Sequence, residues 1–108
     1  MNTLVEDKDI DWKELGGGIK RKIMAHNTEM MVVKVAFETG GIGALHLHPH
    51  TQASYVSKGK FEITIDGQTQ TLSEGDVYFV PSGLEHGAVC IEAGELIDVF
   101  NPMREDFL

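Results

Sequence analysis

Three histidines stand at alternate positions in the stretch HLHPHTQ, and a glutamine follows two residues after the third: His46, His48, His50 and Gln52. In an extended strand, residues i and i+2 point to the same face and lie about 6.5–7 Å apart. We therefore expect His46 and His48 to converge on one centre, with Leu45 and Leu47 facing the other way. Imidazole nitrogen is the commonest protein ligand for first-row divalent metals, so this pair predicts half of a metal site.

The other half of the site is expected from Gln52 and from His86, in the sequence PSGLEHG. Pro81 and Gly83 predict a bend that delivers His86 to the start of the next strand. Three imidazoles and one amide oxygen are neutral, so they would leave a bound ion close to its full 2+ charge, as a Lewis acid and an anion trap. His50 is expected to stay outside, because the proline before it bends the chain.

The length and net charge of the chain limit the kinds of partner that we expect for such a site. The chain has 108 residues, enough for one compact domain, and a formal net charge of −8. An acidic chain argues against nucleic acid as a partner, because phosphate binding needs a basic surface. The only basic run, KRK at Lys20–Lys22, is interpreted as a solvated strand face.

The cellular setting is predicted from what the sequence contains. Cys90 is the single cysteine, so no internal disulfide can form, which fits a reducing compartment. The N-terminus has neither the basic nor the apolar region of a secretory signal, and no apolar run approaches the ~20 residues of a membrane span. We expect a cytoplasmic protein with no membrane partner.

The elements that must position these residues are strands. Residues Met30–Glu38 are rich in β-branched and apolar side chains, and Lys60–Asp66 alternates with its apolar side chains on one face. Asp66-Gly67 predicts a type I′ hairpin, and a second hairpin is expected around Ala93-Gly94. Many short strands and no long amphipathic helix indicate an all-β sandwich or barrel spanning residues 19–108. Residues 1–18 are interpreted as an N-terminal arm, with one helical turn near Trp12.

Two spacings in the sequence resemble the cupin family. The first cupin motif is matched by Gly40, His46, His48, Gln52 and Gly59, and the second by Gly75, Pro81, Gly83 and His86. The resemblance implies a double-stranded β-helix, or jelly-roll barrel, with a metal held inside one end by His46, His48, Gln52 and His86. The ion that we expect there is a divalent transition metal: Ni, Zn, Fe, Mn or Co. The chain departs from the family at Gln52, where glutamate is usual, and at Cys90, where asparagine is frequent and which we expect to pack as a small apolar residue.

Three longer segments resemble a narrower group, the pectin-degradation cupins of the KdgF type. These segments are WKELGGGIKRKIM, HPHTQASYVSKGKFEITIDG and LIDVFNPMREDFL. The resemblance implies a small sugar acid as partner. It also implies an enzyme that converts 4,5-unsaturated monouronates from pectin or alginate into linear, ketonised 5-keto-4-deoxyuronate.

The last segment supplies the candidate catalytic residues. Asp98 shares a strand face with Leu96 and Phe100, so it faces either solvent or a cavity. The resemblance places an acid of this strand near the metal, as the base. Arg104 either pairs with its acidic neighbours or captures the sugar carboxylate. Phe100 is a core residue or a wall against the sugar ring, and Tyr55 is expected at the mouth of the site.

Two other functions stay open at this stage. Metal-dependent oxygenases also use this fold, although their iron sites often include a carboxylate that Gln52 does not supply. A sugar-binding cupin without catalysis would need no base at Asp98. A homodimer is expected in either case, because the polar arm and a sheet edge are natural association surfaces.

Overall fold

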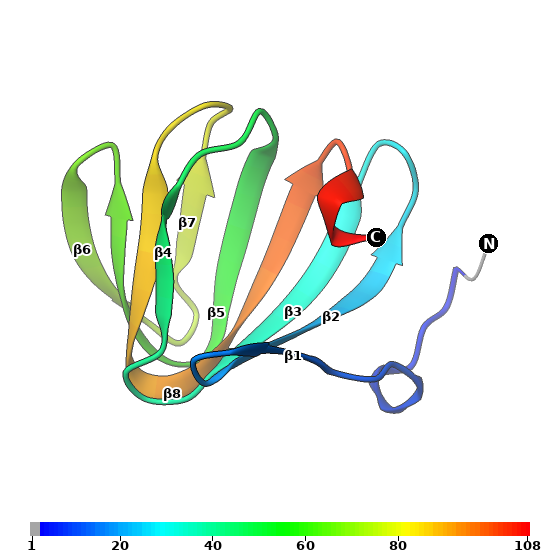
Figure 1. The fold of residues 1–108 in the computed structure, drawn as a ribbon, viewed down its shortest axis with the longest axis horizontal. Helices are drawn as coiled ribbons and strands as arrows, with labels where there is room; N and C mark the ends of the chain where they lie inside the picture. Colours follow the sequence, from blue (N-terminus) through cyan, green and yellow to red (C-terminus); the bar gives the residue numbers. More distant parts are fainter. Residues whose placement is uncertain (1–2) are drawn as a thin grey trace.

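The protein is built almost entirely of antiparallel strands. The computed structural model describes residues 3–108, and its elements are η1 (Asp7–Asp9), β1 (Lys13–Gly16), β2 (Ile19–His26), β3 (Met31–Phe37), β4 (Ile42–His46), β5 (Thr51–Ile65), β6 (Gln68–Ser73), β7 (Val77–Val80), β8 (His86–Asn101) and η2 (Glu105–Phe107). The two helices have three residues each, so neither is long enough to cross a membrane. The predicted all-β jelly roll is confirmed (Figure 1).

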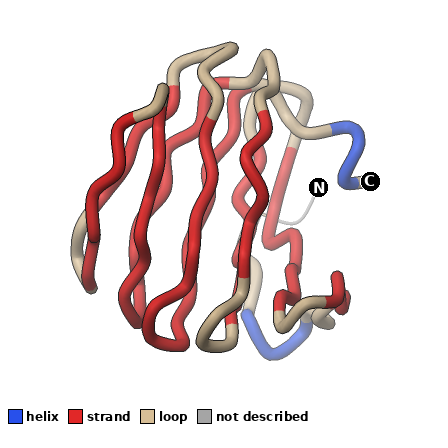
Figure 2. The backbone as a smooth tube through the Cα atoms, turned by 60° about the vertical axis from the view of Figure 1, so that its left-hand side comes forward, coloured by secondary structure: helices blue, strands red, loops and turns tan. Residues whose placement is uncertain are grey.

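Two long strands belong to both halves of the barrel. The sheet runs β1-β2-β3-β8-β5-β6, with β4 paired to β8 and β7 paired to β5. The first part of β8 pairs with β4 and with the second part of β5, and its remainder pairs with β3 and with the first part of β5. The tube in Figure 2 shows these strands running side by side and the loops gathered at their ends. The candidate residues on β4, β5 and β8 are thereby brought into one structure.

Strands β5 and β8 pass from one half of the barrel to the other at the point where Gly59 of β5 packs against Gly94 of β8. Gly59 has φ of +81°, and a Cβ there would lie 2.5 Å from the oxygen of Glu92 and 2.6 Å from that of Ala93. A Cβ on Gly94 would collide with the backbone oxygen of Lys58. The hairpin predicted around Ala93-Gly94 is therefore wrong: β8 continues through both residues, and the glycine permits close strand packing instead of a reversal.

The interior follows the alternation read from the sequence. Phe61 and Ile63 are buried and Glu62 is exposed. Asp66 and Gly67 both have positive φ, 50° and 79°, as a type I′ turn requires, so the predicted hairpin is confirmed. Cys90 is buried in the main hydrophobic cluster, as expected of a small apolar side chain.

The segment before residue 19 takes part in the sheet. Its strand β1 pairs with β2, and its short helix lies at Asp7–Asp9, ahead of the position expected near Trp12. The Lys22 ammonium is buried, 2.8 Å from an Asp7 carboxylate oxygen and 4.5 Å from the centre of the Trp12 ring. The interpretation of the basic run as a solvated face is therefore wrong, since this lysine fastens the N-terminal segment to the barrel.

Candidate metal centre and its cavity

Three imidazoles from two distant segments meet at one end of the barrel. His46 is the last residue of β4, His48 lies in the following loop, and His86 is the first residue of β8, opposite His46 in the ladder. The ring centroid of His46 lies 4.4 Å from that of His86 and 5.5 Å from that of His48, and the His48–His86 separation is 4.8 Å. One ring nitrogen of each lies within 4.8 Å of the other two. Leu45 and Leu47 are exposed on the outside, as expected.

A backbone carbonyl two residues away fixes each imidazole. The Nδ1–H groups of His46, His48 and His86 donate to the carbonyl oxygens of residues 44, 50 and 84, at 2.8, 3.0 and 2.9 Å. Because a carbonyl can only accept, Nδ1 carries the proton and Nε2 keeps its lone pair in the neutral ring. Burial lowers the pKa of His48 and of His86, which favours that neutral form.

The Nε2 lone pairs of His48 and His86 receive no hydrogen from a donor, which suits them to bind a cation. His86 Nε2 is fully buried and has no hydrogen-bond partner among residues 3–108. His48 Nε2 lies 3.0 Å from Oε1 of Gln52, and neither atom has a hydrogen to donate when Nδ1 of His48 is protonated and the ring is neutral. Two facing lone pairs repel unless a positive ion lies beside both. At metal–ligand distances of about 2.1 Å, neighbouring ligand atoms are about 3 Å apart, which is the separation of His48 Nε2 and Gln52 Oε1, so this pair fits a divalent metal.

A hydrogen-bonded chain joins this centre to a buried carboxylate. The Gln52 Nε2–H donates to Ser54 Oγ at 2.9 Å, and the Ser54 hydroxyl donates to Oδ1 of Asp98 at 2.6 Å. Gln52, Ser54 and Asp98 are all buried. Burial raises the pKa of Asp98 to about 6, although the Ser54 hydrogen bond and the Arg104 charge act in the opposite direction. The chain thus contains a carboxylic acid able to exchange a proton near neutral pH.

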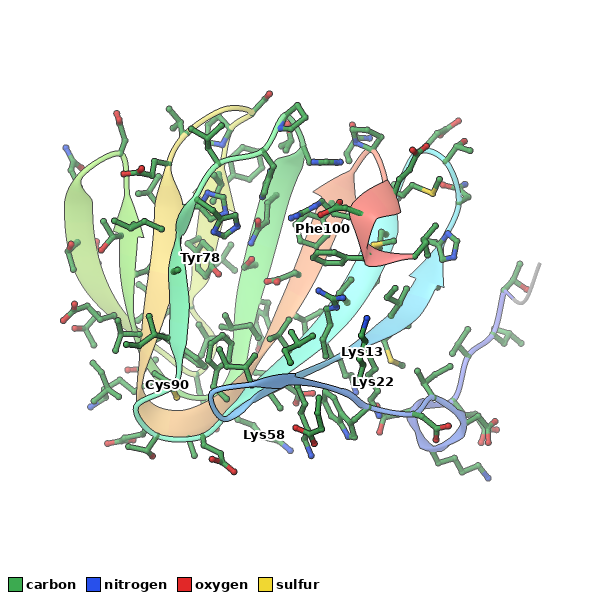
Figure 3. The ribbon with its side chains drawn as sticks, viewed as in Figure 1. Lys13, Lys22, Lys58, Tyr78, Cys90 and Phe100 are labelled. Atoms are coloured by element: carbon green, nitrogen blue, oxygen red, sulfur yellow. The ribbon has the colours of Figure 1, made fainter. Side chains whose placement is uncertain are left out.

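These groups open on one cavity of about 200 Å³, mainly apolar in lining. Among residues 3–108, Asp98 is the only carboxylate in its wall, which also contains His46, Gln52, His86, Tyr78, Phe100, Phe107, Arg21 and Arg104. Figure 3 shows Phe100 beside the C-terminal helix η2, at the end of the barrel away from Lys58 and Cys90. The cavity therefore brings two imidazoles of the cluster, a buried carboxylate and two guanidinium groups together within a small, mainly apolar enclosure.

Most of the expected site residues meet here, and Tyr55 does not. Tyr55 is 45% exposed on the outer face of β5, because it is an odd number of residues from Gln52 and so points the opposite way; Tyr78 lines the cavity instead. His50 stays outside the imidazole cluster, as expected. Ser54 and Arg21 were not foreseen, although strand alternation places Ser54 on the face of Gln52 and Arg21 on the face of Ile19 and Ile23.

The class of this protein is a small jelly-roll barrel of the cupin type, with three imidazoles that converge at one end and could bind a metal. Residues 33–100 match the Cupin domain family. The chain is 45% identical to the pectin degradation protein KdgF of Dickeya dadantii, over the whole of both chains. It therefore belongs to the cupin family, in the group of pectin-degradation proteins that includes KdgF.

Two solved structures share the whole fold. A RmlC-like cupin from Shewanella frigidimarina is 42% identical, covers 100% of this chain and 97% of its own, and superposes with a TM-score of 0.97. The structure of KdgF from Halomonas sp. is 38% identical over the full length of both chains, with a TM-score of 0.94. Oxalate decarboxylase from Bacillus subtilis, at 23% identity and covering 98% of this chain and 32% of its own, shares the barrel alone (TM-score 0.81).

Proposed function

We propose that the protein converts 4,5-unsaturated monouronates, the sugar acids released from pectin or alginate, into linear 5-keto-4-deoxyuronate. The observation that carries the proposal is the buried Asp98 carboxylate, which faces the same cavity as His46 and His86, two of the three clustered imidazoles. The similarity to pectin-degradation proteins over the full length supports the substrate class.

The reaction is a ring opening followed by a proton transfer to carbon. Asp98, as general base, removes the proton from the anomeric hydroxyl. The oxygen–hydrogen electrons form the C1 carbonyl as the bond between C1 and the ring oxygen breaks. The ring oxygen leaves as an enolate at C5. Asp98, now protonated, or a water molecule then protonates C4, which gives the C5 ketone with no gain or loss of electrons.

The metal and the remaining residues have distinct proposed roles. His46, His48, Gln52 and His86 would hold a divalent ion, which when bound supplies Lewis-acid stabilisation of the enolate oxygen. Phe100, 2% exposed and 5.8 Å from the His48 ring centroid, forms an apolar wall against the sugar. Arg104 adds positive charge to the cavity that receives the anionic substrate.

The activity is tested with unsaturated galacturonate freshly made by a lyase. Loss of the absorbance of its double bond should accelerate when the metal-loaded protein is added and return to the spontaneous rate with excess chelator. Equal rates with and without protein would remove the enzymatic proposal. Oxygen consumption by the iron(II)-loaded protein would favour an oxygenase in its place.

An apolar patch on the outside supports a proposed homodimer. Val77 and Phe79 on β7 are 59% and 58% exposed, beside the half-exposed Tyr55 of β5. Pairing two copies would remove such side chains from water. Light scattering across a concentration series measures the mass, and a constant mass near 11.9 kDa would exclude the dimer.

A further inference from the structure

An arginine on β2, Arg21, lines the same cavity as the histidines of β4 and β8. Arg21 lies between Ile19 and Ile23 on the inner face, and its side chain lines the same cavity as Asp98 and His46. Its guanidinium carbon lies 3.8 Å from the centre of the Phe107 ring. Stacking on this ring restricts the orientation of the planar group while leaving its N–H donors free.

The charge of Arg21 has no direct counter-ion within the part of the chain that the structure describes. Across residues 3–108, no carboxylate oxygen lies within 4.0 Å of its guanidinium nitrogens. Burial and the nearby positive charge of Arg104 both lower its pKa, with the Asp106 charge opposing them. An anionic ligand that enters the cavity would therefore stabilise this partly buried, unpaired cation.

The second cavity arginine is already engaged. Arg104 Nε and Nη2 donate to the two carboxylate oxygens of Asp106 at 3.0 and 2.8 Å, which is a bidentate pair. The Arg104 side chain is 11% exposed, and its guanidinium carbon lies 4.3 Å from the centre of the Phe107 ring. Of the two roles expected from the sequence, Arg104 thus takes the pairing with an acidic neighbour, and this pair holds the C-terminal segment.

We propose that Arg21, and not Arg104, is the principal binding residue for the carboxylate of the sugar acid. The inference rests on the proposed function and names the residue that selects acids over esters and neutral sugars. Arg104 supports this site indirectly, since its pair with Asp106 keeps Phe107 beneath the Arg21 guanidinium. A bidentate contact to a carboxylate is the geometry for which an oriented guanidinium is suited.

The test compares binding of saturated galacturonate, which cannot react, with binding of its uncharged methyl ester. Isothermal calorimetry on the metal-loaded protein is expected to show that Arg21→Met weakens the acid by 10- to 100-fold and leaves the ester within about twofold. A charged hydrogen bond of about 1.5–3 kcal/mol corresponds to that range. Arg21→Lys should recover part of the preference, because it restores charge without the fork.

Matched variants separate this role from a structural one. Lys58→Met removes the same charge at the opposite end of the barrel and should change neither affinity (Figure 3). Arg104→Met should reduce the acid-to-ester preference less than Arg21→Met does, while making the C-terminus easier for carboxypeptidase to digest. If Arg21→Met does not fold, as judged by circular dichroism, Arg21→Lys decides alone.

An unchanged acid-to-ester ratio in the folded Arg21 variant, or an equal loss for acid and ester, would overturn the proposal. A larger fall of the acid-to-ester affinity ratio in Arg104→Met than in Arg21→Met would also overturn it. Failure of the proposed reaction is recognised separately, because the wild-type protein would then bind the acid without turning over its unsaturated counterpart.

Discussion

Replacing Asp98 with asparagine is expected to remove turnover and, at the same time, to stabilise the metal-free protein at neutral pH. Asp98 is 8% exposed, and burial raises its pKa from 3.8 to about 6. The folded protein therefore binds a proton at this group more readily than the unfolded chain does. Its free energy of unfolding falls as the pH rises from about 4 to about 6, and the loss persists above that range.

The size of the effect follows from the pKa. Each pKa unit corresponds to ~1.36 kcal/mol, so the ionised carboxylate costs about 3 kcal/mol of folding stability. Asparagine has nearly the same shape and stays neutral, and its Oδ1 can accept the hydrogen bond that Ser54 now donates to Asp98. For a domain of this length, such a gain would raise the melting temperature on the order of 10 °C.

Urea unfolding of the chelator-treated wild type and Asp98→Asn, from pH 4 to pH 8, measures the difference. It should be close to zero at pH 4 and approach about 3 kcal/mol in favour of the variant above pH 7. Turnover is measured separately on the metal-loaded proteins. If Asp98→Asn were less stable than the wild type at pH 7.5, the electrostatic reasoning would be refuted. If Asp98→Asn turned over substrate at the wild-type rate, the role of Asp98 as base would be refuted.

Three further substitutions test the centre and its frame. His86→Ala should lose the metal, because His86 Nε2 is a buried ring nitrogen of the cluster with no hydrogen-bond partner in residues 3–108; elemental analysis after gel filtration measures this, and full retention would contradict the ligand set. Ser54→Ala removes a hydrogen bond that lowers the pKa of Asp98, so the acid limb of the kcat/KM profile should move to higher pH, and an unmoved limb would disconnect Ser54 from the base. Gly59→Ala should cost at least about 2 kcal/mol in urea unfolding, since its Cβ would meet two backbone oxygens at positive φ; a near-neutral result would contradict the close packing there.

The convergence of the three imidazoles was predictable because local signals determine it. The i, i+2 spacing of His46 and His48, and the bend before His86, remain meaningful wherever the strands lie. Even the tautomers are set locally, since each Nδ1–H donates to a carbonyl only two residues away. The backbone near each ligand therefore holds most of the orientation that the site needs.

The features that sequence reasoning missed depend on contacts between distant segments. Gly94 has the appearance of a turn residue until Lys58 is known to pack against it. A lysine next to an arginine suggests solvent exposure, yet Lys22 is covered by the N-terminal segment and Arg21 by the C-terminal one. Alternation alone assigns Arg21 to the face of Ile19 and Ile23, but it does not reveal that this face encloses a cavity.

The amide at position 52 explains how a cluster of metal-ligating side chains and a buried carboxylate coexist in one small enclosure. Ser54 has a single hydroxyl hydrogen, which it donates to Asp98, so it needs a donor on its other side, and the Gln52 amide supplies one. A glutamate at 52 would leave two carboxylates competing for that hydrogen, and one of them would lie buried without a donor. It would also cancel part of the charge of a bound cation. With glutamine, Asp98 remains the only acidic group that the described residues place in the cavity wall, and the positive groups around it remain available to an anionic ligand.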